Sequence, residues 1–170
     1  MAEHTTVGEI RRVIHEAYPP QLAESWDAVG LVCGDPADEV RTVAFALDCT
    51  QEVADKAVEL GAQMLVVHHP LLLRGVTSVA ADTPKGKVIH TLIRNGVALL
   101  AAHTNADKAR PGVNDKLAEL VGITPGRPIV PVEPYENLDE ALGLGRVGEL
   151  EQPMTLRAVS YTHLTLPTTF

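Results

Sequence analysis

The first hydrophobic pattern of the chain has the period of a helix. Apolar residues recur at spacings of three and four between Val7 and Ala17, so they share one helical face. Thr6 and Glu9 have the spacing of a capping box in front of this run. A pair of prolines from position 19 ends the pattern. We therefore predict an amphipathic helix here, followed by an extended strand or loop over residues 25–35.

Short apolar runs then alternate with further helical patterns. The predicted strands cover residues 41–47, 64–67 and 97–103, and the predicted helices cover 51–60, 84–95 and 113–121. Strand, helix and strand in this rhythm make crossovers between parallel strands. The pattern predicts an α/β fold, a mostly parallel sheet with helices on both faces, and the start of a second α/β domain after it.

A proline-rich stretch marks the predicted domain boundary. Four prolines fall within residues 124–134, so we assign 1–123 to the first domain and 124–158 to a linker and the beginning of a truncated second domain. The last twelve residues, 159–170, are uncharged and rich in threonine, and we expect them to be a non-native tail. We therefore exclude His163 from any site.

Composition and charge limit the kinds of protein to which this chain can belong. The chain is 45% hydrophobic and 21% charged, with a net charge of -8, which is typical of a globular domain and argues against binding to nucleic-acid phosphates. No signal segment or run long enough to span a membrane is present, so a cytoplasmic location is expected. The two cysteines, Cys33 and Cys49, form no Cys-x-x-Cys pair, and we interpret them as packing residues.

Polar side chains capable of binding a metal follow the predicted strands. His68 and His69 follow the second strand, His103 ends the third, and Asp107 lies four positions later. Ligands of parallel sheets bind at the carboxyl ends of the strands. Neighbouring residues of a straight strand point to opposite faces, so both histidines reach one site only if the chain leaves the strand there, as Pro70 indicates.

Imidazole and carboxylate together suit zinc, iron, manganese or nickel. Two such ions held close together would activate a bridging water near neutral pH. Asp48 ends the first strand, but an aspartate in front of a helix often only caps it, so it stays outside the predicted ligand set. His90 lies within a predicted helix and is also excluded. The alternative that the strand-end histidines only pack and bind nothing stays open.

One motif resembles a nucleotide site but has the wrong context. Residues 143–148, GLGRVG, match G-x-G-x-x-G, which marks a dinucleotide site when it follows a strand and opens a helix. Here the motif follows a charged, helix-like segment and runs into GELEQP. We therefore reject a nucleotide-binding role for it.

These residues together resemble the Nif-three-like dinuclear metal-centre family, whose members are often named GTP cyclohydrolase type-2 homologues. The resemblance spans roughly residues 5–158 and rests on SWDAVGLVCGD, LVVHHPLLL, AAHTNADKARPGVNDKLAELVG and GLGRVGEL. It implies a homohexameric ring of two-domain α/β subunits with two divalent metal ions each. It also implies that His68, His69 and Asp107 are metal ligands and that His103 is a catalytic group that handles a proton.

The sequence departs from the family pattern in one respect. Members complete their centre with a His-x-x-x-Glu near the carboxyl terminus, and no such pattern occurs here. We therefore expect this chain to be an inactive fragment that holds at most one ion, weakly. Trp26, Asp27 and Gly30 are interpreted as packing and turn residues near the cleft.

Two functions follow from this resemblance. The first is a metal-dependent hydrolase of a small nucleotide-like substrate, with no nucleic-acid or membrane partner. The second is a non-enzymatic metal-binding hexamer with an assembly or regulatory role. Metal binding without turnover would favour the second.

Overall fold

The computed structural model describes residues 5–159 and divides the chain into two compact units, 1–106 and 107–170. The division falls earlier in the chain than the boundary that the prolines predict at 124. Among the described residues, none of the helices has both the length and the apolar character needed to cross a membrane.

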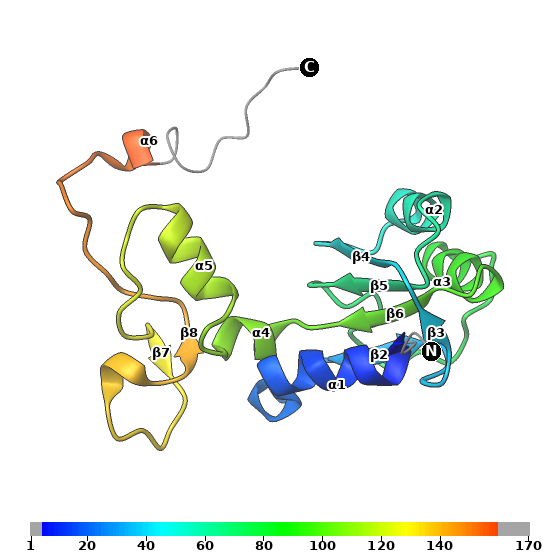
Figure 1. Ribbon diagram of the computed structural model, residues 1–170, viewed down its shortest axis with the longest axis horizontal. Helices are drawn as coiled ribbons and strands as arrows, with labels where there is room; N and C mark the ends of the chain where they lie inside the picture. Colours follow the sequence, from blue (N-terminus) through cyan, green and yellow to red (C-terminus); the bar gives the residue numbers. More distant parts are fainter. Residues whose placement is uncertain (1–4, 160–170) are drawn as a thin grey trace. The chain divides into compact units, whose positions relative to one another are not determined.

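The first unit is built on a four-stranded sheet, seen in Figure 1. Its strands are β2 (Gly30–Cys33), β4 (Val43–Ala46), β5 (Met64–Val67) and β6 (Ala98–Ala101), in the order β2-β6-β5-β4. The three strands β4, β5 and β6 are parallel, and β2 pairs antiparallel with β6. The prediction of a mostly parallel sheet is confirmed.

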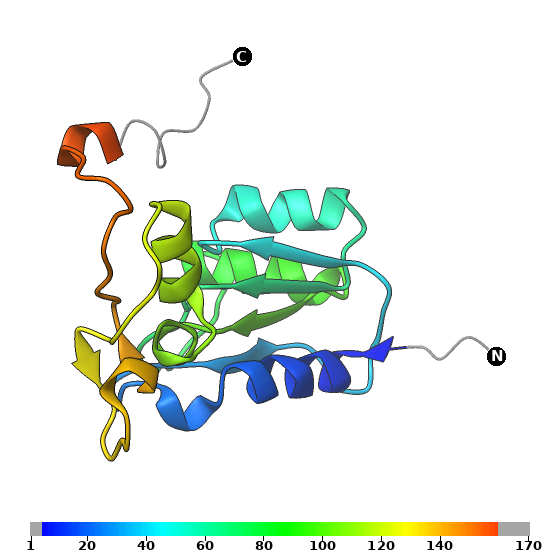
Figure 2. The ribbon, with the colours of Figure 1, turned by 60° about the vertical axis from the view of Figure 1, so that its left-hand side comes forward.

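Helices cover both faces of this sheet, as predicted. They are α1 (Val7–Ala17), α2 (Gln51–Glu59) and α3 (Pro84–Arg94), and Figure 2 shows α1 and α2 on opposite sides of the strands. The capping box between Thr6 and Glu9 is formed at the start of α1. The side chains of Thr50 and Thr83 accept the hydrogen bonds that begin α2 and α3.

The two central strands are buried on both faces. Leu65, Val67, Leu99 and Ala101 pack against α2 and α3, whereas the alternate residues of the same strands pack against α1. This division follows from the two-residue period of a strand. A short pair, β1 (Thr5–Thr6) and β3 (Glu39–Val40), and a 3-10 turn, η1 (Pro20–Leu22), complete the unit.

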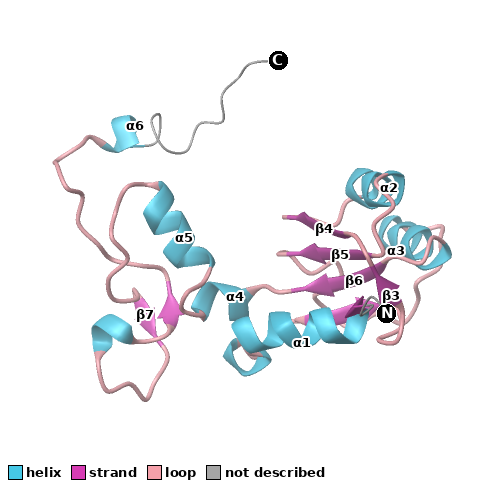
Figure 3. Cartoon of the chain, in the orientation of Figure 1, coloured by secondary structure: helices cyan, strands magenta, loops and turns pink. Residues whose placement is uncertain are grey.

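The second unit contains shorter elements, coloured by type in Figure 3. They are α5 (Val113–Leu120), β7 (Val130–Pro131), η2 (Leu138–Glu140), β8 (Gly143–Leu144) and α6 (Leu156–Val159), while α4 (Thr104–Lys108) crosses the division between the units. Strands β7 and β8 pair antiparallel, and Ile123 bridges to Leu150.

The glycines of the motif at 143–148 allow close backbone contacts in and beside this small sheet. A Cβ on Gly143 would lie 2.2 Å from the Val130 carbonyl oxygen, and one on Gly148 would lie 2.3 Å from that of Thr124. Both positions therefore need glycine so that two backbone segments can approach. Between them, the buried Arg146 pairs with Asp115, with Nε 2.5 Å from Oδ1 and Nη2 2.8 Å from Oδ2. The motif has a structural role, in agreement with its rejection as a nucleotide site.

Candidate metal site

His68 and His69 lie where the chain leaves the sheet. Strand β5 ends at Val67, and the next two residues form a bend before Pro70. Their amides still donate to the carbonyl oxygens of Ala46 and Leu47, at 3.2 and 2.9 Å, so the bend stays attached to the end of β4. This is the exit predicted from Pro70, and it allows two neighbouring residues to face the same site.

His103 joins this pair because β5 and β6 are parallel and in register. Val67 is opposite Ala101, so the residues after each strand emerge side by side. One ligand nitrogen from each of His68, His69 and His103 lies within 4.8 Å of the other two. The ring centroids are 5.0 to 5.6 Å apart. Within residues 5–159 this is the one group of metal-ligating side chains with that spacing.

Each of the three rings is fixed by a hydrogen bond at Nδ1. The acceptors are the Ala102 carbonyl oxygen for His68 at 3.0 Å, Asp48 Oδ1 for His69 at 2.7 Å, and Asp27 Oδ1 for His103 at 3.0 Å. An oxygen acceptor at Nδ1 places the proton there in the neutral ring. This identifies Nε2 as the nitrogen that would bind an ion or exchange a proton, which is the usual arrangement of metal-bound histidines.

The carboxylate of Asp27 lies beside the site, buried and hydrogen-bonded. Its side chain is 0% exposed, against 17% for His103. It accepts hydrogen bonds from the amides of Ala28 and Thr104, at 2.7 and 3.0 Å, and from the Thr104 hydroxyl and the His103 ring. Burial alone would raise the pKa of Asp27, but these hydrogen bonds outweigh it and hold the pKa below its ordinary value.

Sequence reasoning missed this role of Asp27, which it interpreted as a turn residue. The partner of Asp27 lies 76 positions away, so no local pattern links the two. Asp48 was left outside the ligand set and contacts His69 instead, in a pair that is about half exposed. In the sequence, the contact of Asp48 with His69 was indicated only by the place of Asp48 at the end of the first predicted strand.

The remaining predicted ligand belongs to the other unit. Asp107 lies in α4, at the first position of the second unit, and its backbone carbonyl accepts a hydrogen bond of 2.8 Å from Asn114 Nδ2. Its convergence with the histidines stays a prediction. His163, which was excluded, lies outside the described residues. His90 lies in α3, outside the histidine cluster.

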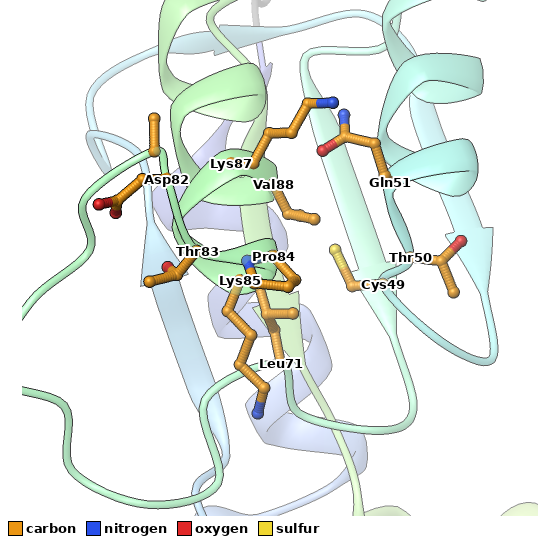
Figure 4. A pocket seen from close by; sticks show the side chains of 11 residues that line it. Cys49, Thr50, Gln51, Leu71, Asp82, Thr83, Pro84, Lys85, Lys87 and Val88 are labelled. Carbon is orange, nitrogen blue, oxygen red and sulfur yellow. The ribbon is translucent and has the colours of Figure 1, made fainter.

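A cavity of about 570 Å³ lies beside the loops that carry these residues, between the starts of α2 and α3 (Figure 4). Cys49, which follows Asp48, and Leu71, which follows Pro70, belong to its wall together with Val88. None of the three histidines lines it within the described chain.

Known proteins share this sequence and fold. A protein of Streptomyces coelicolor named GTP cyclohydrolase 1 type 2 homolog is 51% identical over 154 residues, which cover 91% of this chain and 53% of that protein. The solved structure of a Bacillus cereus protein related to NIF3 superposes with a TM-score of 0.72 at 39% identity, covering 77% of this chain and 36% of that one. Reduced HcgD from Methanocaldococcus jannaschii gives a TM-score of 0.67 at 32% identity, covering 75% and 51%.

The chain thus spans about half of the Streptomyces relative and about a third to a half of the two solved chains. A sequence profile of one family, Duf34/NIF3 (NGG1p interacting factor 3), matches residues 5–163. This match extends over most of the sequence, and it includes the histidine cluster and the GLGRVG segment. The chain therefore belongs to the Duf34/NIF3 family.

Proposed function

We propose that His68 and His69 bind a divalent transition-metal ion together with Asp107, and that the protein is a metal-dependent hydrolase of a small nucleotide-like substrate. The observation that carries the proposal is the convergence of the three histidines, because one ring nitrogen of each lies within 4.8 Å of the other two. Zinc, iron, manganese and nickel all accept such a set of nitrogens and oxygens.

The metal would supply acidity, since a bound divalent ion lowers the pKa of water toward neutrality. The protein residues orient and exchange protons around it. His103 is the proposed proton carrier: Asp27 holds its Nδ1, so Nε2 is the atom that takes and returns a proton. The buried Asp27 carboxylate also fixes the orientation of the ring, as carboxylates do in other histidine bases.

The names of the relatives support a nucleotide-like substrate. The Streptomyces protein is named for homology to a GTP cyclohydrolase, and the fragment matched here contains the whole histidine cluster. We extend that substrate class to this chain as part of the proposal. A homohexameric assembly, with two ions in each subunit of full-length members, is likewise part of it, as the family resemblance implies. For this chain, which has no His-x-x-x-Glu pattern, we expect at most one ion.

The test compares the chain with two histidine variants. Metal content of this chain is measured by elemental analysis. We expect at most one weakly held ion per chain, lost in His68→Ala and kept in His90→Ala, the control outside the cluster. Hydrolysis of GTP is followed by chromatography of the products. This turnover measurement, like those below, uses the full-length Streptomyces relative with the equivalent residue replaced, because this chain is expected to be an inactive fragment. We expect turnover to be lost with the ion.

A second variant separates the ligands from the proton carrier. We expect His103→Ala to keep its metal and lose turnover, whereas loss of the ion would make His103 a ligand. Equal metal content in the chain and in His68→Ala would contradict the proposed site. Metal binding without hydrolysis of GTP or of related nucleotides would contradict the proposed enzyme and favour the assembly role.

A further inference from the structure

An exposed tryptophan stands beside the histidine cluster. Trp26 is the single tryptophan of the sequence, and it is 57% exposed. Its ring centroid lies 6.1 Å from that of His103, with the two planes at 75°. Tryptophan carries a large apolar surface that proteins normally bury. An exposed tryptophan ring beside a polar site is therefore uncommon and points to a binding role.

The backbone around Trp26 is held firmly, so its position does not result from a loose loop. The amide of Glu24 donates to the Thr104 hydroxyl at 2.9 Å, and the amide of Asp27 donates to the Glu24 carbonyl at 2.9 Å. The next side chain, Asp27, is buried and accepts four hydrogen bonds. The same segment that orients His103 therefore fixes the tryptophan next to it.

We propose that Trp26 is a stacking platform for a planar heteroaromatic ring of the substrate. A molecule whose polar end sits at the histidine cluster would place its other end within reach of Trp26, because His103 contacts both. Any purine or pyrimidine presents a π-face to such a ring. The substrate class is then a nucleotide rather than a simple phosphate ester or a sugar phosphate.

The inference deepens the proposed function and rests on it for the location of the substrate's polar end. It also corrects the interpretation of Trp26 as a packing residue, because more than half of the residue is open to solvent.

The single tryptophan allows a direct test on the 170-residue chain. Trp26 fluorescence is titrated with guanosine monophosphate, in zinc-loaded and in chelator-treated protein, with ribose phosphate as the matched probe that lacks a base. We expect saturable quenching by the nucleotide and none by ribose phosphate. Access of acrylamide to Trp26 is measured in the same samples, and a ring that is shielded from acrylamide by a second copy of the chain would overturn the proposal.

Two substitutions test the ring itself, with binding followed by equilibrium dialysis. We expect Trp26→Leu to weaken nucleotide binding roughly 5- to 150-fold, the range that base stacking on an aromatic ring provides, while Trp26→Phe keeps most of the affinity. Thermal unfolding by circular dichroism checks that both variants fold. Unchanged affinity in Trp26→Leu, or equal binding of ribose phosphate, would overturn the platform.

The outcomes also separate this inference from the proposed function. Nucleotide binding that depends on Trp26 in a protein without metal or turnover would keep the platform and overturn the hydrolase. Metal-dependent turnover that is equal in Trp26→Leu and the unchanged chain would keep the hydrolase and overturn the platform.

Discussion

Asp27 accepts a hydrogen bond from Nδ1 of His103 across 3.0 Å, although the two residues lie 76 positions apart in the sequence. Asp27 belongs to the segment before β2, and His103 follows β6. These two strands pair antiparallel, with Gly30 opposite Ala101, so the pairing itself brings the carboxylate to the ring. The orientation of the proposed proton carrier is thus a direct product of sheet topology.

Asp27→Asn should impair turnover more than metal binding. An amide cannot accept hydrogen bonds at both of its terminal atoms, so it cannot replace the carboxylate that accepts from His103, Thr104 and Ala28. We expect the rate of hydrolysis to fall on the order of 10²- to 10⁴-fold, the usual contribution of a positioned proton carrier. Nitrogen NMR of His103 should show Nδ1 protonated in the unchanged chain and mixed tautomers in the variant. A single, unchanged tautomer would contradict this account.

Asp48→Asn, in contrast, should weaken metal binding more than it slows turnover. Asp48 holds His69, a proposed ligand, through a 2.7 Å contact between Oδ1 and Nδ1. Loss of such an outer carboxylate commonly weakens metal binding 10- to 100-fold. Competition with a chelating dye should show this loss, with the rate at saturating metal nearly unchanged. Asp55→Asn, on the exposed surface of α2, is the matched control, and equal metal affinity in both variants would contradict the prediction.

Arg146→Met should destabilise the second unit. The substitution leaves the Asp115 carboxylate, 8% exposed, without its two guanidinium hydrogen bonds. Removing one partner of a buried ion pair typically lowers the free energy of unfolding by about 3–5 kcal/mol. Hydrogen exchange of the amides in α5 should accelerate accordingly. Lys116→Met, which breaks the exposed pair with Glu119, should change stability by less than about 1 kcal/mol, and similar effects of both substitutions would contradict a special role for Arg146.

The same pair should make the second unit sensitive to acid. Burial alone would raise the pKa of Asp115, but hydrogen bonds from Arg146 and the Gly112 amide, with the charges of Arg146 and Arg110, lower it below the ordinary value. A carboxyl whose pKa is lowered by folding adds stability above its unfolded pKa, about 3.9, and loses it as the pH falls toward the folded pKa. The difference in unfolding free energy between the chain and Asp115→Asn should therefore be constant above about pH 5 and shrink below about pH 4. A difference that does not change with pH would exclude this contribution.

Cys49 should react slowly while the protein is folded. Burial, and then the nearby Cys33, raise the pKa of Cys49 from 9.0 to about 11. The reactive thiolate is then about 100-fold scarcer at pH 8 than for an ordinary thiol. Alkylation with iodoacetamide, followed by mass spectrometry, should label Cys49 only after denaturation. Rapid labelling in the native chain would contradict its interpretation as a packing residue.

Local patterns predicted the secondary structure of the first unit well. The capping box at Thr6, the strand at residues 64–67 and the proline at the start of α3 each depend on neighbours within one or two turns. The exit of the chain at His68 was predictable for the same reason, because Pro70 limits the residue before it. The three histidines that lie together in the structure could be found from their places at the ends of the predicted strands.

The supporting residues could not be found, because their partners are distant. Asp27 depends on a strand pairing whose direction the pattern at residues 25–35 left open, and Arg146 depends on Asp115, 31 positions earlier. The sequence does not distinguish a buried charged residue from an exposed one, so its burial becomes evident only from its tertiary contacts. The role of Asp107, the first residue of the second unit, remains a prediction.

The three Nδ1 acceptors of the cluster come from three unrelated places: a strand-end carbonyl, an exposed aspartate and a buried aspartate. Each ring is therefore held by a hydrogen-bond acceptor of its own. Asp27→Asn or Asp48→Asn therefore changes the support of a single ring, whereas the support of His68 is a backbone carbonyl that no side-chain substitution deletes.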